Sequence, residues 1–156
     1  MRYLGIDLGD KRTGLAVGDN VLRVASPVGL VEVPRSDEPG LIAKLAQACD
    51  EHLGPEDGVV FGLPVHMDGS EGDRAKIVRA FAGLFAQTTG RKPRFQDERL
   101  TSAQADWQMA QSGLTHKQKK RRRDAMAAAA ILQDFLESEH GPNADSGSGT
   151  SREGPE

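Results

Sequence analysis

The chain has 156 residues, of which 28% are charged and 37% are hydrophobic, and its formal net charge is −3. This length and composition predict one soluble globular domain with a core of its own. The apolar runs are too short for a membrane span, the N-terminus lacks a signal pattern, and the single cysteine, Cys49, excludes a disulfide framework or a Cys-rich zinc site. We therefore expect a cytoplasmic protein.

Residues 2–18 are typical of two short strands folded on each other, with a turn at residues 9–11. The leucine and isoleucine side chains of the first strand share one face, and Asp7 lies on the opposite face. A charged carboxylate in a core strand costs several kcal/mol unless it has a partner. Asp7 is therefore predicted to have a strong partner, and a metal ion is one candidate.

The middle of the chain alternates between strand and helix patterns. We expect a third strand within 21–33, bent or at a sheet edge near Pro27, and a buried strand over 58–64 typical of a partly parallel sheet. Helical spacing of apolar residues predicts helices over 40–53 and 73–88. A last strand is expected at 93–98.

The C-terminal part is predicted to contain a helix from 101 to about 112, a connector over 113–118 and a terminal helix over 124–140. Asp124 falls on the core-facing stripe of that last helix, one or two turns from its start. Residues 141–156 are rich in Gly, Ser, Pro and small acids, and we expect them to form a disordered tail after a domain spanning 1–140. The order of elements indicates a mixed α/β sheet with helices packed on it.

Three carboxylates stand out by position: Asp7, Glu98 at the end of the last strand, and Asp124. A terminal helix packed over a central first strand would bring them together, and they would then raise one another's pKa values unless cations neutralised them. Oxygen ligands without thiols or a histidine cluster suit Mg²⁺ or Mn²⁺, which can activate water against a phosphodiester. Taken singly, the three could equally be a turn residue, a strand-end charge and an acid near a helix N-terminus.

A dense basic run precedes Asp124, and local charge density matters more for phosphate binding than the net charge does. A solvated surface segment is the alternative interpretation. The six cations are Lys117, Lys119, Lys120, Arg121, Arg122 and Arg123. Their position beside a candidate metal ligand favours contact with a nucleic-acid backbone.

Four motifs in this order resemble the YqgF family, the candidate pre-16S rRNA nucleases that are also called Holliday-junction-resolvase-like proteins. The resemblance covers about residues 2–136. The motifs are LGIDLG at 4–9 with KRTG at 11–14, GLP at 62–64 with MDG at 67–69, DERLT at 97–101, and Asp124 followed by AA at 127–128 and ILQ at 131–133.

The resemblance implies an RNase H-like fold, a five-stranded mixed sheet flanked by helices. It also implies that Asp7, Glu98 and Asp124 are the catalytic, metal-binding set, with Mg²⁺ or Mn²⁺ as cofactor. The implied reaction is hydrolysis of a phosphodiester in structured RNA during 5′-end maturation of 16S rRNA. We further expect Lys11, Arg12 and Arg99 to contact the substrate backbone.

Three other functions remain open at this point. Cleavage of branched DNA is the inference that fold similarity alone would suggest, and fold similarity is weak evidence for a substrate. An actin-like ATPase or sugar kinase could begin with the same glycine-rich strand, but the chain lacks the length and a second phosphate motif. The third is a binding protein of ribosome assembly or transcription whose acidic site is not catalytic.

Overall fold

The computed structural model describes residues 1–98 and 115–139. Its strands and helices are β1 (Arg2–Asp7), β2 (Thr13–Asp19), β3 (Val24–Val31), α1 (Glu38–His52), β4 (Gly58–Leu63), α2 (Asp73–Thr89), β5 (Pro93–Asp97) and α4 (His116–Glu139). The strands form one sheet in the order β3-β2-β1-β4-β5. Strand β2 is antiparallel to both β1 and β3, and β4 and β5 run parallel to β1. The predicted five-stranded mixed sheet is confirmed.

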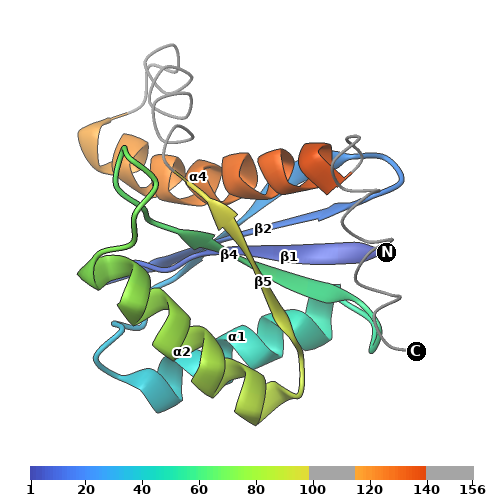
Figure 1. The fold of residues 1–156 in the computed structure, drawn as a ribbon, viewed down its shortest axis with the longest axis horizontal. Helices are drawn as coiled ribbons and strands as arrows, with labels where there is room; N and C mark the ends of the chain where they lie inside the picture. Colours follow the sequence, from blue (N-terminus) through green and yellow to red (C-terminus); the bar gives the residue numbers. More distant parts are fainter. Residues whose placement is uncertain (99–114, 140–156) are drawn as a thin grey trace.

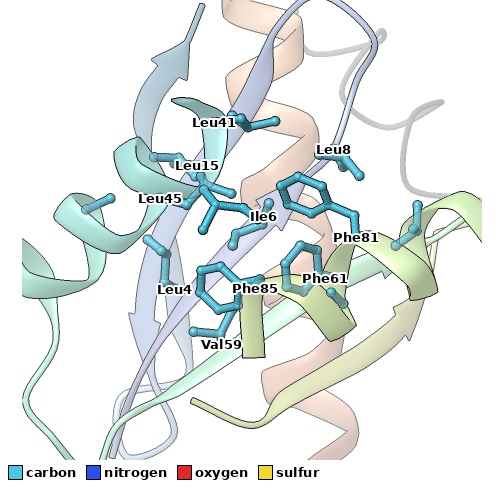
Figure 2. Packing of buried hydrophobic residues seen from close by; sticks show 14 of the residues in the cluster. Leu4, Ile6, Leu8, Leu15, Leu41, Leu45, Val59, Phe61, Phe81 and Phe85 are labelled. Carbon is cyan, nitrogen blue, oxygen red and sulfur yellow. The ribbon is translucent and has the colours of Figure 1, made fainter. Parts of the chain in front are cut away.

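The sheet is the middle layer of three, with α4 on one face and α1 and α2 on the other (Figure 1). The larger core lies between the sheet and the α1–α2 pair, where Phe61 of β4 packs edge-on against Phe81 and Phe85 of α2. Figure 2 shows these rings beside Leu4 and Ile6 of β1, which are fully buried. No helix in the described part of the chain is long and apolar enough to cross a membrane.

The alternation predicted for β1 is confirmed. Leu4 and Ile6 belong to the core under α1 and α2, whereas Tyr3 belongs to a second buried cluster under α4. Within that second cluster the ring of Tyr3 packs against Phe135 of α4 with centroids 5.0 Å apart. Asp7 follows Tyr3 by four residues, so its side chain belongs to the face that α4 covers.

The caps of α1 and α2 and the edge strand β3 are formed by residue types that favour these positions. Asp37 accepts a hydrogen bond from the amide of Gly40 at the start of α1, and Gly90 ends α2 with a positive φ of 76°. Strand β3 lies at the edge of the sheet, and its register shifts where Ala16 of β2 meets Pro27. The expectation of an edge strand disturbed by a proline is confirmed.

The start predicted for the terminal helix was wrong. Helix α4 begins at His116, so residues 116–118 are helical and are not part of a connector. Thr115 and Gln118 form a reciprocal cap, because the Thr115 hydroxyl accepts from the Gln118 amide and the Gln118 side chain accepts from the Thr115 amide. Asp124 therefore lies eight residues into the helix, beyond the first turn where the helix dipole favours acids. The helix predicted over 101–112 and the predicted tail lie outside the described residues.

Candidate metal and nucleic-acid site

The site is built around Asp7, the last residue of the central strand. Asp7 is paired in register with Gly14 of β2. Two residues earlier, a methyl group at Gly5 would lie 2.8 Å from Cβ of Leu132, which shows that this face of β1 is in close contact with α4. The strand therefore directs Asp7 toward α4, at the end of the sheet where β1 and β4 both finish.

Gly14 brings Asp124 to this point. A methyl group at Gly14 would lie 2.2 Å from the carbonyl oxygen of Asp124 and 3.5 Å from Cα of Ala125. Only glycine allows the backbone of α4 to come this close to β2. Because Gly14 is the register partner of Asp7, the turn of α4 that carries Asp124 lies directly over the Asp7 end of the hairpin.

Glu98 approaches from the other side of β1. Its amide donates to the carbonyl of Leu63 at the end of β4, with the two atoms 3.3 Å apart. Its Oε1 would lie 2.7 Å from a methyl group at Gly62, so the carboxylate folds back over β4 on the α4 side of the sheet. Strand β4 is hydrogen-bonded to β1, with Phe61 opposite Ile6. The Glu98 carboxylate thus lies one strand from Asp7.

The carboxylates influence one another electrostatically. Burial and, to a lesser extent, the negative charges of Glu98 and Asp124 together raise the pKa of Asp7 to about 7, while Arg74 lowers it. Burial also raises the pKa of Glu98, against the opposing effect of Arg74. The three acids predicted from the sequence therefore lie on one face of the sheet, close enough for Glu98 and Asp124 to act on the charge of Asp7.

An open pocket of about 320 Å³ adjoins Asp7, and it is lined by Asp7, Gly9, Asp10, Lys11, Arg12, Gly14 and Asp124. Within it, Nη1 of Arg12 lies 3.4 Å from Oδ2 of Asp124. As the side chains lie, no three acids, histidines or cysteines among the described residues are grouped closely enough to enclose a metal ion. The donor set nevertheless has the chemistry that a hard divalent cation requires, namely carboxylate oxygens without thiol ligands.

The residues predicted to contact nucleic acid lie in separate parts of the structure, and some of them are only partly described or not described. Lys11 and Arg12 line the pocket beside Asp7. The basic run forms the first two turns of α4, where the side chains of residues 121–123 are exposed and Arg121 pairs with Glu32. Only the backbone of Lys117, Lys119 and Lys120 is described, and Arg99 lies outside the described residues.

The sequence reasoning missed Arg74, which lies in the first turn of α2. Its charge lowers the pKa values of Asp7, Asp10 and Glu98, so Arg74 lies near enough to act on the acidic site, on a helix that covers the face of the sheet opposite α4 (Figure 1). It also lines a second pocket of about 560 Å³ together with Pro64, Val65, His66, Gly72 and Asp73. A cation in the first turn of a helix opposes the helix dipole, and this unfavourable position could have singled out Arg74 in the sequence.

The chain matches the family RuvX, described as Holliday junction resolvase, over residues 1–138. A relative from Anaeromyxobacter sp. (strain Fw109-5), named as a candidate pre-16S rRNA nuclease, is 42% identical over 140 residues, which cover 90% of this chain and 99% of the relative. A relative with the same name from Lactococcus lactis subsp. cremoris (strain MG1363) is 38% identical over 138 residues, covering 87% and 94%.

Two solved structures share the fold at low sequence identity. The Fowlpox virus resolvase in complex with Holliday junction DNA has a TM-score of 0.57 at 12% identity, covering 90% of this chain and 100% of that one. RuvC from T. thermophilus, in complex with a Holliday junction substrate, has a TM-score of 0.52 at 14% identity, covering 90% and 96%. These likenesses confirm the RNase H-like fold predicted from the sequence.

Proposed function

The chain belongs to the RuvX family and is a nuclease, a hydrolase of phosphodiester bonds, and on this basis we propose that it matures precursor 16S rRNA with divalent metal ions. The proposed ligands are Asp7, Glu98 and Asp124. The resemblance to the YqgF family is confirmed by the family match and by relatives that cover almost the whole chain. The metal, the ligand set and the RNA substrate are the proposed parts.

The observation that carries the proposal is the raised pKa of the half-buried Asp7, caused by burial and by the two carboxylates that converge on it. A cation between these groups would offset the effects of burial and of the neighbouring carboxylates, and would hold Asp7 ionised. Bound Mg²⁺ or Mn²⁺ would activate the attacking water and stabilise the leaving oxygen. The protein's part is to fix the three carboxylates on rigid elements, two at strand ends and one on α4.

Precursor rRNA is the first candidate substrate because relatives about 40% identical over nearly the whole chain carry that name. Junction DNA is the second candidate, favoured by the description of the matching family. Both substrates are structured and present a phosphate backbone near a branch or a helix end. The two candidates share the acidic site and differ in what the surrounding cations contact.

The first two turns of α4 support a polyanionic partner. Six of the seven residues 117–123 are cations, and the first turn of the helix contains no acid. Cations at a helix N-terminus oppose the dipole and repel one another, so this arrangement is unfavourable without a compensating anion. A nucleic-acid backbone lying along the start of α4 would supply that anion, beside Asp124.

Changing the three arginines 121–123 to glutamine is expected to weaken nucleic-acid binding and to reduce the slope of log K against log salt by up to about 2–3, because each lost phosphate contact removes roughly 0.7–0.9 of slope. Fluorescence anisotropy over a series of salt concentrations measures this. The matched control changes Arg2, Lys44 and Lys92 to glutamine, which alters the net charge equally. Equal slopes for the two variants would contradict a specific role for the start of α4.

The function is tested by incubating the pure protein with precursor 16S rRNA, with four-way DNA junctions and with unstructured strands of each. We expect a defined cut in the rRNA precursor with Mg²⁺ or Mn²⁺ and no product in EDTA. Product mapping on gels then identifies the cleaved bond. Junction cleavage with intact rRNA would favour the second candidate, and cleavage of either substrate in EDTA would overturn the metal-dependent mechanism.

A further inference from the structure

Arg12 lies in a pocket that contains both a proposed metal ligand, Asp124, and a proposed nucleic-acid contact, Lys11. It immediately precedes β2, and its guanidinium pairs with Asp124, one of the three proposed metal ligands. The same pocket is open to the surface and also contains Lys11. Arg12 therefore lies where a substrate phosphate and a metal ligand are both within its reach.

The pair has the properties of a contact that is easily exchanged. Its nitrogen and oxygen atoms are 3.4 Å apart, and the two side chains are 24% and 33% exposed. This distance is long for a charge-assisted hydrogen bond, so the contact is weak. Arg12 cannot give up its charge by losing a proton, so Asp124 is released only when the guanidinium moves away. A phosphate group is a strong alternative partner, because it accepts two parallel hydrogen bonds from a guanidinium.

The remaining charges in the pocket favour this exchange. Asp10 pairs with Arg35, with Nη2 and Oδ1 2.8 Å apart. Asp10 therefore does not compete with Asp124 for the Arg12 guanidinium. Asp7 lines the same pocket as Asp124, and the Glu98 carboxylate lies over the neighbouring strand β4. Removal of Arg12 from Asp124 would add the negative charge of a third carboxylate to this group. A divalent cation would then be attracted more strongly.

We propose that Arg12 is a positioning residue that holds Asp124 until nucleic acid binds, and that it then transfers to a backbone phosphate and leaves Asp124 free for the metal ion. The proposal rests on the proposed function and adds to it that substrate and metal bind cooperatively. Thermodynamic linkage makes the effect reciprocal: substrate raises metal affinity by the same factor by which metal raises substrate affinity. An enzyme built in this way assembles its metal site at the moment when the substrate is in place.

The proposal predicts that the substitution Arg12→Gln changes the affinities for Mn²⁺ and for RNA in opposite directions. Arg12→Gln should bind Mn²⁺ about three- to tenfold more tightly in the absence of nucleic acid, since the competing charge on Asp124 is gone. The same variant should bind a structured RNA several-fold more weakly in EDTA, where no cleavage occurs. Titration calorimetry with Mn²⁺ alone and anisotropy with labelled RNA give the two values.

Two variants serve as controls. Lys11→Gln removes the same charge from the same pocket, but Lys11 pairs with no carboxylate in the described part of the chain, so Mn²⁺ affinity should change less than twofold. Arg12→Lys keeps the charge and should stay within twofold of the parent chain for Mn²⁺. Circular dichroism confirms that each variant folds.

The outcomes separate this inference from the proposed function. If the parent chain binds Mn²⁺ and Asp7→Asn abolishes that binding, the metal site stands. Equal Mn²⁺ affinities for Arg12→Gln and Lys11→Gln would then overturn the role of Arg12 alone. If the parent chain shows no Mn²⁺ binding that depends on Asp7, both the metal site and the coupling are overturned.

Discussion

Asp7→Asn is expected to abolish phosphodiester cleavage, with a loss of at least about 10³-fold in kcat, and at the same time to stabilise the metal-free fold. An amide cannot replace a carboxylate as the central ligand, and the loss of a metal's charge stabilisation in the transition state amounts to several kcal/mol. Nucleic-acid binding in EDTA should persist or improve, because the change removes a negative charge that repels phosphate. Gel assays and anisotropy measure the two effects.

The gain in stability follows from the pKa of Asp7, which is about 7 in the folded protein against an ordinary value near 3.8. Between these two pH values the folded state retains a proton that the unfolded state has lost. The free energy of unfolding of the metal-free parent chain should therefore fall as pH rises from about 4 to about 7 and then level off. At about 1.4 kcal/mol per pH unit, the fall is at most roughly 4 kcal/mol.

Urea unfolding in EDTA across this pH range measures the effect, and Asp7→Asn should remove most of the fall. Asp10→Asn is the matched control, because Asp10 lines the same pocket but is exposed, and its hydrogen bond with Arg35 lowers its pKa. It should produce no gain in stability at neutral pH. Cleavage that survives in Asp7→Asn would contradict the metal site. If the free energy of unfolding depended on pH equally in the parent chain and the variant, the raised pKa of Asp7 would be contradicted.

The site's acidic residues could be predicted because the sequence carries their positions in short-range patterns. The alternation in β1 placed Asp7 on the face opposite Leu4 and Ile6, and the apolar stripe of the last helix placed Asp124 toward the sheet. The buried run at 58–63 predicted a strand in the parallel part of the sheet. From these elements alone the convergence of Asp7, Glu98 and Asp124 could be expected.

The start of α4 could not be predicted from periodicity, because its first two turns contain almost no apolar residues and therefore give no helical pattern. The spacing of Thr115 and Gln118 was the remaining signal, and it fits a capping box. Arg74 and the pair between Arg12 and Asp124 depend on contacts between elements far apart in the chain. Such contacts need the register of the sheet, which composition and spacing do not supply.

Gly14→Ala is expected to damage both the fold and the site. The new methyl group would lie 2.2 Å from the carbonyl oxygen of Asp124, and this neighbour is helix backbone that cannot rotate away as a side chain could. Helix α4 must shift, which should cost about 1–3 kcal/mol of stability as in other overpacked cores. Because a displacement of about 1 Å in a catalytic group can cost roughly 10²-fold, kcat should fall by at least about tenfold.

Gly83→Ala is the matched control for this prediction. Gly83 lies within α2, and a methyl group there would meet nothing within 4 Å, so the change should stabilise the protein by about 0.5–1 kcal/mol through helix propensity and leave cleavage unchanged. Thermal unfolding and single-turnover cleavage distinguish the two variants. NMR titration of the Asp7 carboxyl adds a readout of the site itself: if α4 carries Asp124 away, the pKa of Asp7 in Gly14→Ala should fall below its value of about 7 in the parent chain, because one of the charges that raises it has moved. A Gly14→Ala protein with unchanged melting temperature, cleavage rate and Asp7 titration would show that the close approach of α4 to β2 does not position Asp124.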